Sequence, residues 1–395
     1  MSLNSSKRNA VPQSSIHVLR PQAMLAAFLI GTTIALAILV IYFGGKKTNF
    51  EDAATFGAQT TSVFAKVGVY PIHCADSRDL AACLAGARDR KAVHSVLWLG
   101  NSQVHAVNQL QKGETNAVPI LFDALRRRGF DLLTFSQPNA NLQEHYVLFE
   151  YLRRQLPLRV LVLPVVFDDL REEGLRNEIA ILTRDDATVS ALSETEIGRR
   201  LVTAVHTVPQ DQDTAGIAKT MQERVERYIN LWLEKHSSLW QARPEIRGQL
   251  IYGVLYNLRN TLFGIKATSK RKMMPGRYLD NMDALEEMLI TAKRNNISVV
   301  LYVAPFRGGV ENPYIDTEYA RFKSDVKILS RRYGAVYENM EMLVPGDLWG
   351  TKDATALGGE AEVDFMHFQY GGHKLLAGRL EGLVVEAMAS REKEQ

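Results

Sequence analysis

Three residues far apart in the sequence have side chains that could act together on an acyl group. Ser102 follows an apolar run through Gly100 and Asn101, and Asp364 and His367 form an Asp-x-x-His pair near the carboxyl end. A serine becomes a nucleophile when a histidine accepts its proton, and a carboxylate can hold that histidine in the required tautomer. The types and order of these residues therefore predict a serine nucleophile with a histidine base.

Ser102 has a second interpretation, because a serine between a strand and a helix is often only the helix N-cap. The pairing with His367 favours the nucleophile, since an Asp-x-x-His pair stands just before the predicted last helix. We expect His105 and His145 to lie at the surface or in a crevice, and His373 to pack or be solvated within that helix.

Polar side chains also follow the other predicted strands. Asn139 and Asn141 come after the second strand, and Asp168 and Arg171 come after the third. In open α/β sheets, ligands bind outside the carboxyl ends of the strands. We therefore expect these four residues and Asn101 to bind substrate, with the asparagines as candidates for stabilising an oxyanion.

Two arginines after the third strand allow two interpretations. Arg171 and Arg176 could attract an anionic polymer or a phosphate-bearing carrier. They could instead lie on a solvated helix face and pair with Glu172 and Glu173 at spacings of three or four residues. The second interpretation is the more ordinary one for such a run of charges.

Strands and helices alternate in the pattern of a parallel sheet. The expected strands are 95–100, 131–136, 159–167, 297–305 and 335–339. The expected helices are 118–129, 141–155, 278–296, 317–334 and 371–390. This order predicts a three-layer α/β/α domain of the flavodoxin-like, doubly wound kind over 91–169 and 276–395. Residues 170–275 lack strong strand signals and are expected to form a helical insertion.

The amino-terminal part of the chain resembles a membrane anchor. Residues 23–45 carry no charge, and a helix of that length, at about 1.5 Å per residue, would cross the roughly 30 Å hydrocarbon core. A cleaved signal peptide is the alternative, but its apolar core would be shorter. Basic residues in 1–22 favour a cytoplasmic tail there, with residues 46–90 as a stem and the rest extracytoplasmic.

Composition and cysteine content narrow the possible functions. A net charge of +3 over 395 residues is too small to suggest nucleic-acid binding. The two cysteines, Cys74 and Cys83, could form a disulfide in an oxidising compartment or remain small buried thiols. With His73 they do not complete a four-ligand zinc site, so we expect no metal and no cofactor.

The motifs around the candidate triad resemble those of the SGNH (GDSL-like) hydrolase superfamily. "GNS" at 100–102 is similar to its first block, with Ser102 as the nucleophile, and "DFMH" at 364–367 is similar to its last block. The resemblance implies an SGNH-like fold and a triad of Ser102, Asp364 and His367. It extends over the predicted α/β domain.

The sequence departs from the superfamily pattern at the oxyanion-binding blocks. Asn101 stands where the family usually has Asp, and no glycine follows the second strand. The third strand ends in "PVVFDDL" rather than Gly-x-Asn-Asp. The loss of one oxyanion donor typically lowers turnover by about 10²–10³-fold, so these departures bear on activity.

The predicted anchor and insertion resemble one branch of that superfamily. Its members are extracytoplasmic proteins that work beside multi-pass membrane-bound O-acyltransferases, such as the D-alanine transfer protein of teichoic acids and the alginate O-acetyltransferases. This resemblance implies a single-pass inner-membrane protein that acylates a cell-surface polysaccharide or teichoic-acid-like polymer through an acyl-serine. The implied partners are that acyltransferase, an acyl carrier, the polymer and the bilayer. The alternatives are a carbohydrate esterase or deacetylase, and a non-catalytic partner that binds carrier or polymer.

Overall fold

A computed structural model of the protein describes Gly31 and residues 59–207, 269–352 and 360–392. Apart from Gly31, the predicted tail and anchor lie outside the described residues, as do residues 208–268 of the predicted insertion. All described residues except Gly31 belong to one compact unit made of residues 49–217 and 248–395. Among the described helices, none has the length and apolar character needed to cross a bilayer.

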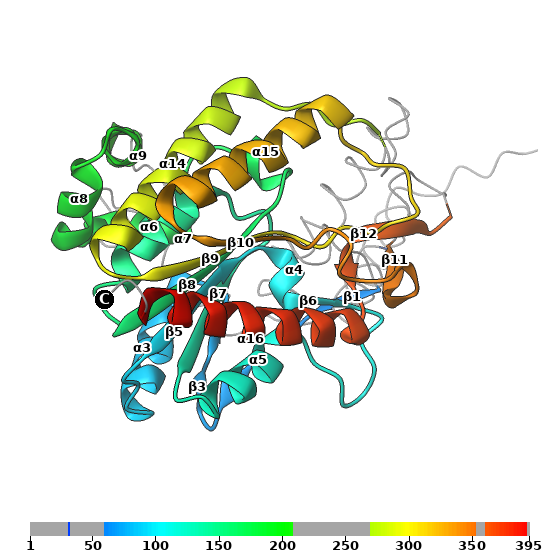
Figure 1. Ribbon diagram of the computed structural model, residues 1–395, viewed down its shortest axis with the longest axis horizontal. Helices are drawn as coiled ribbons and strands as arrows, with labels where there is room; N and C mark the ends of the chain where they lie inside the picture. The colour runs from blue at the N-terminus through cyan, green and yellow to red at the C-terminus, as the bar shows by residue number, and fades with distance from the viewer. Residues whose placement is uncertain (1–30, 32–58, 208–268, 353–359, 393–395) are drawn as a thin grey trace, which may run out of the picture. The chain divides into compact units, whose positions relative to one another are not determined.

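A six-stranded parallel sheet forms the centre of this unit (Figure 1). Its strands, in spatial order, are β10 (Val336–Asn339), β9 (Ser298–Val303), β8 (Leu158–Val165), β5 (Ser95–Gly100), β7 (Asp131–Ser136) and β4 (His73–Cys74). Every residue of β5 and β7 is buried, as expected for parallel strands covered on both faces. The α/β fold and the parallel sheet therefore fit the SGNH-like expectation.

The sixth strand, β4, lies in the segment that the sequence assigned to a stem. It pairs in parallel with β7, so the sheet begins before the predicted boundary at residue 91. A two-residue strand is too short to produce a periodic signal, which explains why the sequence did not predict it. A disulfide joins Cys74 of β4 to Cys83 of α3 (Leu80–Asp89), and both residues are buried.

Helices cover both faces of the sheet. On one face, a buried apolar core includes residues of α3, α6 (Leu142–Leu152), α14 (Pro275–Arg294) and α15 (Asp316–Tyr333). On the other face, a second core includes residues of α5 (Ala117–Arg126) and α16 (Tyr370–Glu392). Figure 1 shows α14 and α15 on one side of the strands and α5 and α16 on the other. The expected three layers are present.

The described part of the predicted insertion is helical. After β8 and the short η2 (Asp169–Arg171), the chain forms α7 (Asn177–Ala180), η3 (Ile181–Arg184), α8 (Asp186–Ser193) and α9 (Glu196–Thr207). Leu192, Ile197 and Leu201 belong to the same buried core as α6 and α14. This segment is therefore part of the packed domain rather than an appendage on it.

Two short segments carry the candidate triad. Helix α4 (Ser102–His105) follows β5 directly and continues into β6 (Ala106–Asn108), which pairs with β1 (Thr60–Ser62). Strand β12 (Glu362–Phe368) contains Asp364 and His367 and pairs antiparallel with β11 (Trp349–Lys352). The sequence did not predict β11 or β12, because β12 mixes charged and apolar residues without clear alternation.

Candidate active site

Ser102, His367 and Asp364 form a continuous hydrogen-bonded line. Ser102 Oγ lies 3.0 Å from His367 Nε2, and His367 Nδ1 lies 3.0 Å from Asp364 Oδ2. All three residues are largely buried. This is the arrangement in which the histidine can accept the serine proton while the carboxylate holds the ring in the tautomer that leaves Nε2 free to do so.

Local hydrogen bonds fold the Asp-x-x-His segment back on itself. Asp364 Oδ1 accepts the backbone N–H groups of Met366, at 2.9 Å, and His367, at 3.0 Å. Burial alone raises the pKa of Asp364, but the charge and hydrogen bond of His367 and the two backbone donors lower it to about 2. The carboxylate is therefore ionised at neutral pH and oriented toward the imidazole.

Asn108, which the sequence did not single out, donates a hydrogen bond to the triad carboxylate. Its Nδ2 donates to Asp364 Oδ2 at 3.2 Å and to the carbonyl of Thr351 at 2.9 Å. A Cβ at Gly350 would collide with the Asn108 amide, so the glycine provides the space that this contact needs. Nothing in the local sequence reveals a contact between residues 108 and 364, because it depends on two strands that meet only in the fold.

Gln103 and Arg307 hydrogen-bond to backbone carbonyls of the segments that surround the triad. Gln103 Nε2 donates to the carbonyls of Pro305 and Met366, both at 2.8 Å. Arg307 Nη1 donates to the carbonyls of Gly350 at 2.7 Å and Asp364 at 3.3 Å. The Gln103 bonds fix α4 relative to β12 and to the segment after β9, and the Arg307 bonds fix that segment relative to β11 and β12.

Asn101 does not take the oxyanion-binding role expected from the sequence. It is the N-cap of α4, and its Oδ1 accepts the Gln103 N–H at 3.0 Å. Its Nδ2 donates to Asp169 Oδ2 at 2.6 Å. Burial raises the pKa of Asp169 well above its ordinary value, which this hydrogen bond opposes. Because Asn101 caps the helix, Ser102 does not, and the N-cap interpretation of Ser102 is wrong.

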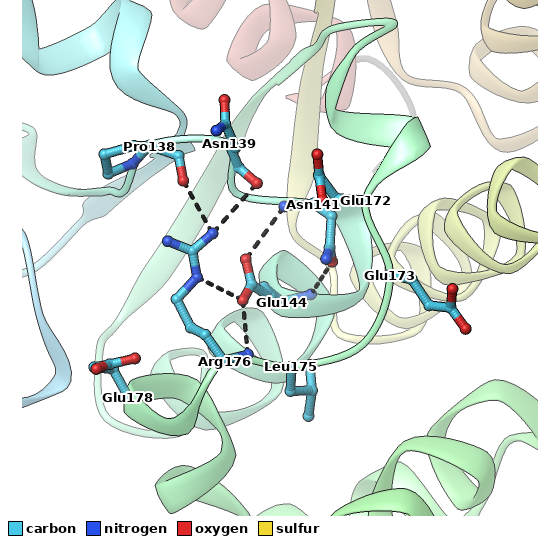
Figure 2. Close-up of a pocket in the computed structure, with 9 residues that line it drawn as sticks. All are labelled: Pro138, Asn139, Asn141, Glu144, Glu172, Glu173, Leu175, Arg176 and Glu178. Atoms are coloured by element: carbon cyan, nitrogen blue, oxygen red, sulfur yellow. Dashed lines mark hydrogen bonds and ion pairs between the residues drawn. The ribbon is translucent and has the colours of Figure 1, made fainter. Parts of the chain in front are cut away.

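Asn139 and Asn141 line a different cavity, shown in Figure 2. The cavity has a volume of about 450 Å³, and neither Ser102 nor His367 lines it. Asn141 forms a capping box with Glu144 at the start of α6, and its Nδ2 donates to the Gly174 carbonyl at 3.0 Å. The structure thus uses the Asn141 amide in helix capping, not in an oxyanion site.

Arg176 and Glu144, which both line this cavity, form an ion pair. Arg176 Nε donates to Glu144 Oε1 at 2.7 Å, and the Arg176 backbone N–H reaches the same oxygen at 3.0 Å (Figure 2). Arg176 Nη2 also donates to the Pro138 carbonyl at 2.9 Å. Arg176 therefore pairs with Glu144. The solvated-face interpretation required a pair with Glu172 or Glu173 and is wrong for this residue.

Asp168 and Arg171 belong to a charged cluster after β8. Asp168 accepts hydrogen bonds from Arg171 Nη1 at 3.2 Å, from Tyr314 Oη at 3.0 Å and from Arg271 Nη1. Two arginines thus share one carboxylate. The partner of Arg171 is Asp168, so the predicted pairing of Arg171 with Glu172 and Glu173 is also wrong.

Two cations flank an aromatic ring inside the triad segment. The guanidinium carbon of Arg271 lies 5.2 Å from the ring centroid of Phe365, and Lys352 Nζ lies 5.8 Å from it. Burial lowers the pKa of Lys352, although the charges of Asp364 and Glu362 raise it. Within the described structure, the Lys352 ammonium has no hydrogen bond and no ion pair.

Several histidines are buried rather than exposed. His105 and His145, expected at the surface or in a crevice, have exposed fractions of 0% and 2%. His73 and His373 are buried too, and burial lowers the pKa of His73, His145 and His373 to about 3. Burial also lowers the pKa of His105, well below its ordinary value. These rings are neutral at pH 7.

The described residues contain no cluster of three or more His, Cys, Asp or Glu that could hold a metal ion. Around the triad, Gln103 and Arg307 donate to backbone carbonyls, and Asn108 donates to Asp364. The chemistry open to this arrangement is that of a serine nucleophile, a histidine base and an ionised carboxylate.

Comparison with known proteins gives weak structural similarities only. Neither a protein-family model nor a curated protein matches the sequence. The fold is similar to that of Axe2, an acetylxylan esterase from Geobacillus stearothermophilus, with 9% identity, 72% of this chain and 91% of that chain covered, and a TM-score of 0.34. It is also similar to a GDSL-like lipase from Bacteroides thetaiotaomicron, with 11% identity, 81% and 98% covered, and a TM-score of 0.33. Scores this low support no conclusion about activity.

Proposed function

We propose that this chain is an SGNH-type serine O-acyltransferase of the cell envelope, acting through an acyl-serine at Ser102. The observation that carries the proposal is the line from Ser102 Oγ to His367 Nε2 and from His367 Nδ1 to Asp364, with both contacts at 3.0 Å. The uncharged segment 23–45 supports a single-pass anchor with the catalytic domain outside the cytoplasm. The acyl group is acetyl or D-alanyl, and a multi-pass membrane-bound O-acyltransferase is the expected partner.

The reaction has two steps at one serine. In the first, His367 Nε2 takes the Ser102 proton as Oγ attacks the acyl carbonyl, and the protonated ring then gives that proton to the leaving group. In the second, a hydroxyl of the acceptor loses its proton to His367, attacks the acyl-serine and releases Ser102 Oγ, which is reprotonated. Asp364 stabilises the imidazolium that forms in each step.

The Ser102 backbone N–H supports the oxyanion side of this scheme. It is the first N–H of α4, a position where helical N–H groups have no acceptor within the helix. The amides of Asn101 and Asn141 are engaged elsewhere and Asn139 lines the separate cavity, so this N–H is the donor that the site supplies itself. This thin donor set also favours the non-catalytic alternative, a partner that binds carrier or polymer, which the labelling experiment below distinguishes.

The cations around Phe365 support an acceptor polymer that carries anionic groups. Arg171 and Arg271 share the single carboxylate of Asp168, and Lys352 has no ion pair within the described structure. An ammonium without a partner beside the triad segment is free to contact a carboxylate or phosphate. A teichoic-acid-like or uronate-containing polymer provides such groups.

A serine-directed fluorophosphonate probe tests the nucleophile. The full-length protein, purified in a non-ionic detergent, should be labelled at Ser102, and Ser102→Ala should abolish the labelling. Ser95→Ala provides the matched control, because Ser95 lies at the opposite end of β5. Folded wild-type protein that remains unlabelled would contradict the enzyme and favour the non-catalytic partner.

Acyl transfer and hydrolysis are separated by following the product. Incubation with p-nitrophenyl acetate and a polyol or oligosaccharide acceptor should yield acylated acceptor, detected by mass spectrometry. Release of free acetate alone, at a rate independent of acceptor, would instead assign a carbohydrate esterase or deacetylase. Both outcomes require Ser102, so this experiment distinguishes the reaction and not the nucleophile.

A further inference from the structure

A buried chain of three polar side chains lies behind the nucleophile and takes no part in the reaction above. His73 Nε2 lies 2.6 Å from Ser136 Oγ, and His105 Nδ1 lies 2.8 Å from the same oxygen. The exposed fraction is 1% for His73 and 0% for both other residues. Phe64 packs against both rings, with centroid distances of 5.0 Å and 5.1 Å. Two imidazoles thus share one hydroxyl in a water-excluded place.

The hydrogen bonds of this chain couple the tautomers of the two rings. One hydroxyl has one proton, so Ser136 donates to one ring and accepts an N–H from the other. His73 meets Ser136 with Nε2 and His105 meets it with Nδ1. When His73 donates from Nε2, His105 accepts at Nδ1 and carries its proton on Nε2; when His105 donates from Nδ1, His73 carries its proton on Nδ1. In both arrangements the two rings carry the proton on the nitrogen of the same name.

The end of this chain is attached to the helix that carries the nucleophile. Ser102 and His105 are the first and last residues of α4, which has only four residues. Ser136 pairs with Gly100 in the β5–β7 register, so the chain's fixed point is the strand beside the start of α4.

We propose that His73, Ser136 and His105 form a hydrogen-bond chain whose role is to position Ser102 for attack. The chain anchors the carboxyl end of α4 to the sheet, while Asn101 caps its amino end. All three are positioning residues, since they act through α4 rather than on the acyl group. The inference rests on the proposed function, because only a reacting Ser102 has an alignment to maintain.

The expected cost of disrupting the chain is large for its distance from the chemistry. A four-residue helix is not stable by itself, so its orientation depends on its attachments. A displacement of the nucleophile by about 1 Å can lower the rate by about 10²-fold. Loss of the His105–Ser136 bond should therefore reduce kcat while leaving substrate binding, and hence KM, almost unchanged.

Two variants of His105 in the full-length protein separate positioning from packing. In His105→Asn the side-chain amide can replace Nδ1 as an acceptor or a donor, and in His105→Phe a ring of similar size remains without a hydrogen-bonding group. For p-nitrophenyl acetate, we expect kcat within about 3-fold of wild type for His105→Asn and about 10–100-fold lower for His105→Phe, with KM within about 2-fold in both. Ser136→Ala should match His105→Phe.

His145→Phe is the matched control, because His145 is also a buried neutral histidine but lies outside the chain. It should lower the unfolding temperature as much as His105→Phe while kcat stays within about 2-fold of wild type. Equal kcat in His105→Phe and His105→Asn would overturn the inference, and so would a kcat loss in His145→Phe that follows its loss of stability. Fluorophosphonate labelling of the wild type in the same samples shows that the proposed nucleophile is intact.

Nitrogen NMR of ¹⁵N-histidine-labelled protein tests the chain without any turnover. His73 and His105 should carry their proton on the nitrogen of the same name, both on Nε2 or both on Nδ1, and Ser136→Ala should change the signals of both rings. A proton on Nδ1 of one ring and on Nε2 of the other would overturn the chain, because Ser136 would then lie between two acceptors or two donors. Because this measurement needs no acylation, a protein that failed the labelling experiment could still show the chain, so the two failures are distinguishable.

Discussion

Ser102 of the triad and the Asn139–Arg176 cavity both follow strands of the central sheet, yet the polar groups of the two regions are used in different ways. At the triad, Ser102, His367 and Asp364 bond to one another, and the residues around them bond to backbone carbonyls that fix the geometry. In the cavity, Asn141 caps α6 and Arg176 pairs with Glu144 (Figure 2). Under the proposed function, the triad residues act on a substrate, whereas the hydrogen bonds in the cavity stabilise the fold.

This difference shows that the place of a polar side chain in the fold and its capacity to hydrogen-bond a ligand are separate conditions. A side chain at the carboxyl end of a parallel strand is well placed for a ligand. It can act on that ligand only if its own hydrogen bonds are not already used by nearby backbone groups. Asn141 and Asn101 meet the first condition and fail the second, since each caps the helix that follows it. Changes at the triad should therefore alter chemistry, and changes at the cavity should alter stability.

The largest expected effect is that of Asp364→Asn. The amide cannot stabilise the imidazolium and favours the wrong ring tautomer, so kcat for p-nitrophenyl acetate should fall by about 10³–10⁴-fold. KM should change little, and circular dichroism should remain that of the wild type. If the variant kept more than a tenth of the wild-type kcat, the triad role of Asp364 would be wrong.

On the side of the Asn139–Arg176 cavity, the buried His145 should make the stability of the fold depend on pH. Burial lowers the pKa of His145 to about 3, from about 6.5 for a free histidine, so only the unfolded chain binds this proton between those values. Stability is therefore lost as pH falls from 6 to 4, by about 1.4 kcal/mol per pH unit for this residue.

Urea unfolding at pH 6, 5 and 4 measures this contribution. The free energy of unfolding should fall less steeply in His145→Gln than in the wild type, by the amount given above. Esterase activity at pH 7 should be the same in both proteins. Parallel pH profiles of stability would show that His145 is not buried in its neutral form.

Gly350→Ala tests the support behind the triad carboxylate. A methyl group at residue 350 would collide with the Asn108 amide and displace it from Asp364. We expect kcat to fall about 10-fold, because one hydrogen bond to a buried charge contributes about 1.5–3 kcal/mol. Gly378→Ala is the control, since a Cβ there meets no other atom. Equal activity in the two variants would show that Asn108 is dispensable.

Lys352→Gln tests whether the Lys352 ammonium contacts the acceptor. KM for an oligogalacturonate or an oligomeric glycerol phosphate should rise about 5-fold, while KM for p-nitrophenyl acetate should not change. Lys270→Gln makes the same charge change at a lysine that already bonds to Asn312 and Glu311. If the two variants raised KM equally, general charge and not Lys352 would account for the effect.

Asn141→Ala should have the smallest effect on activity. Loss of the capping box at α6 should lower the free energy of unfolding by about 1 kcal/mol. Turnover should stay within about 2-fold of wild type, as measured with p-nitrophenyl acetate. A loss of turnover beyond 10-fold with unchanged stability would restore Asn141 as an oxyanion donor and remove the contrast between the two regions.

The sequence was most informative where one local signal decides the outcome. Apolar segments that alternate with helical patterns predicted five strands, and the Asp-x-x-His spacing was enough to identify a pair that hydrogen-bonds in the fold. It was least informative for contacts made across the fold, such as Asn108 with Asp364 and Gln103 with Met366. The error at Asn141 was avoidable, because an asparagine three residues before a glutamate at the start of an apolar helix is a capping-box pattern.

The segment from Ser102 to Asn108 has a consequence for protein engineering. Ser102, His105 and Asn108 occur at intervals of three residues along α4 and β6, and each makes a different contact with the site. A one-residue insertion inside this stretch would rotate or shift all the contacts beyond it, so no single compensating change could restore them. The exposed turn at 111–113 should accept an inserted residue or a short tag. Residues 102–108 should therefore be transferred to another protein, or redesigned, only as one complete segment.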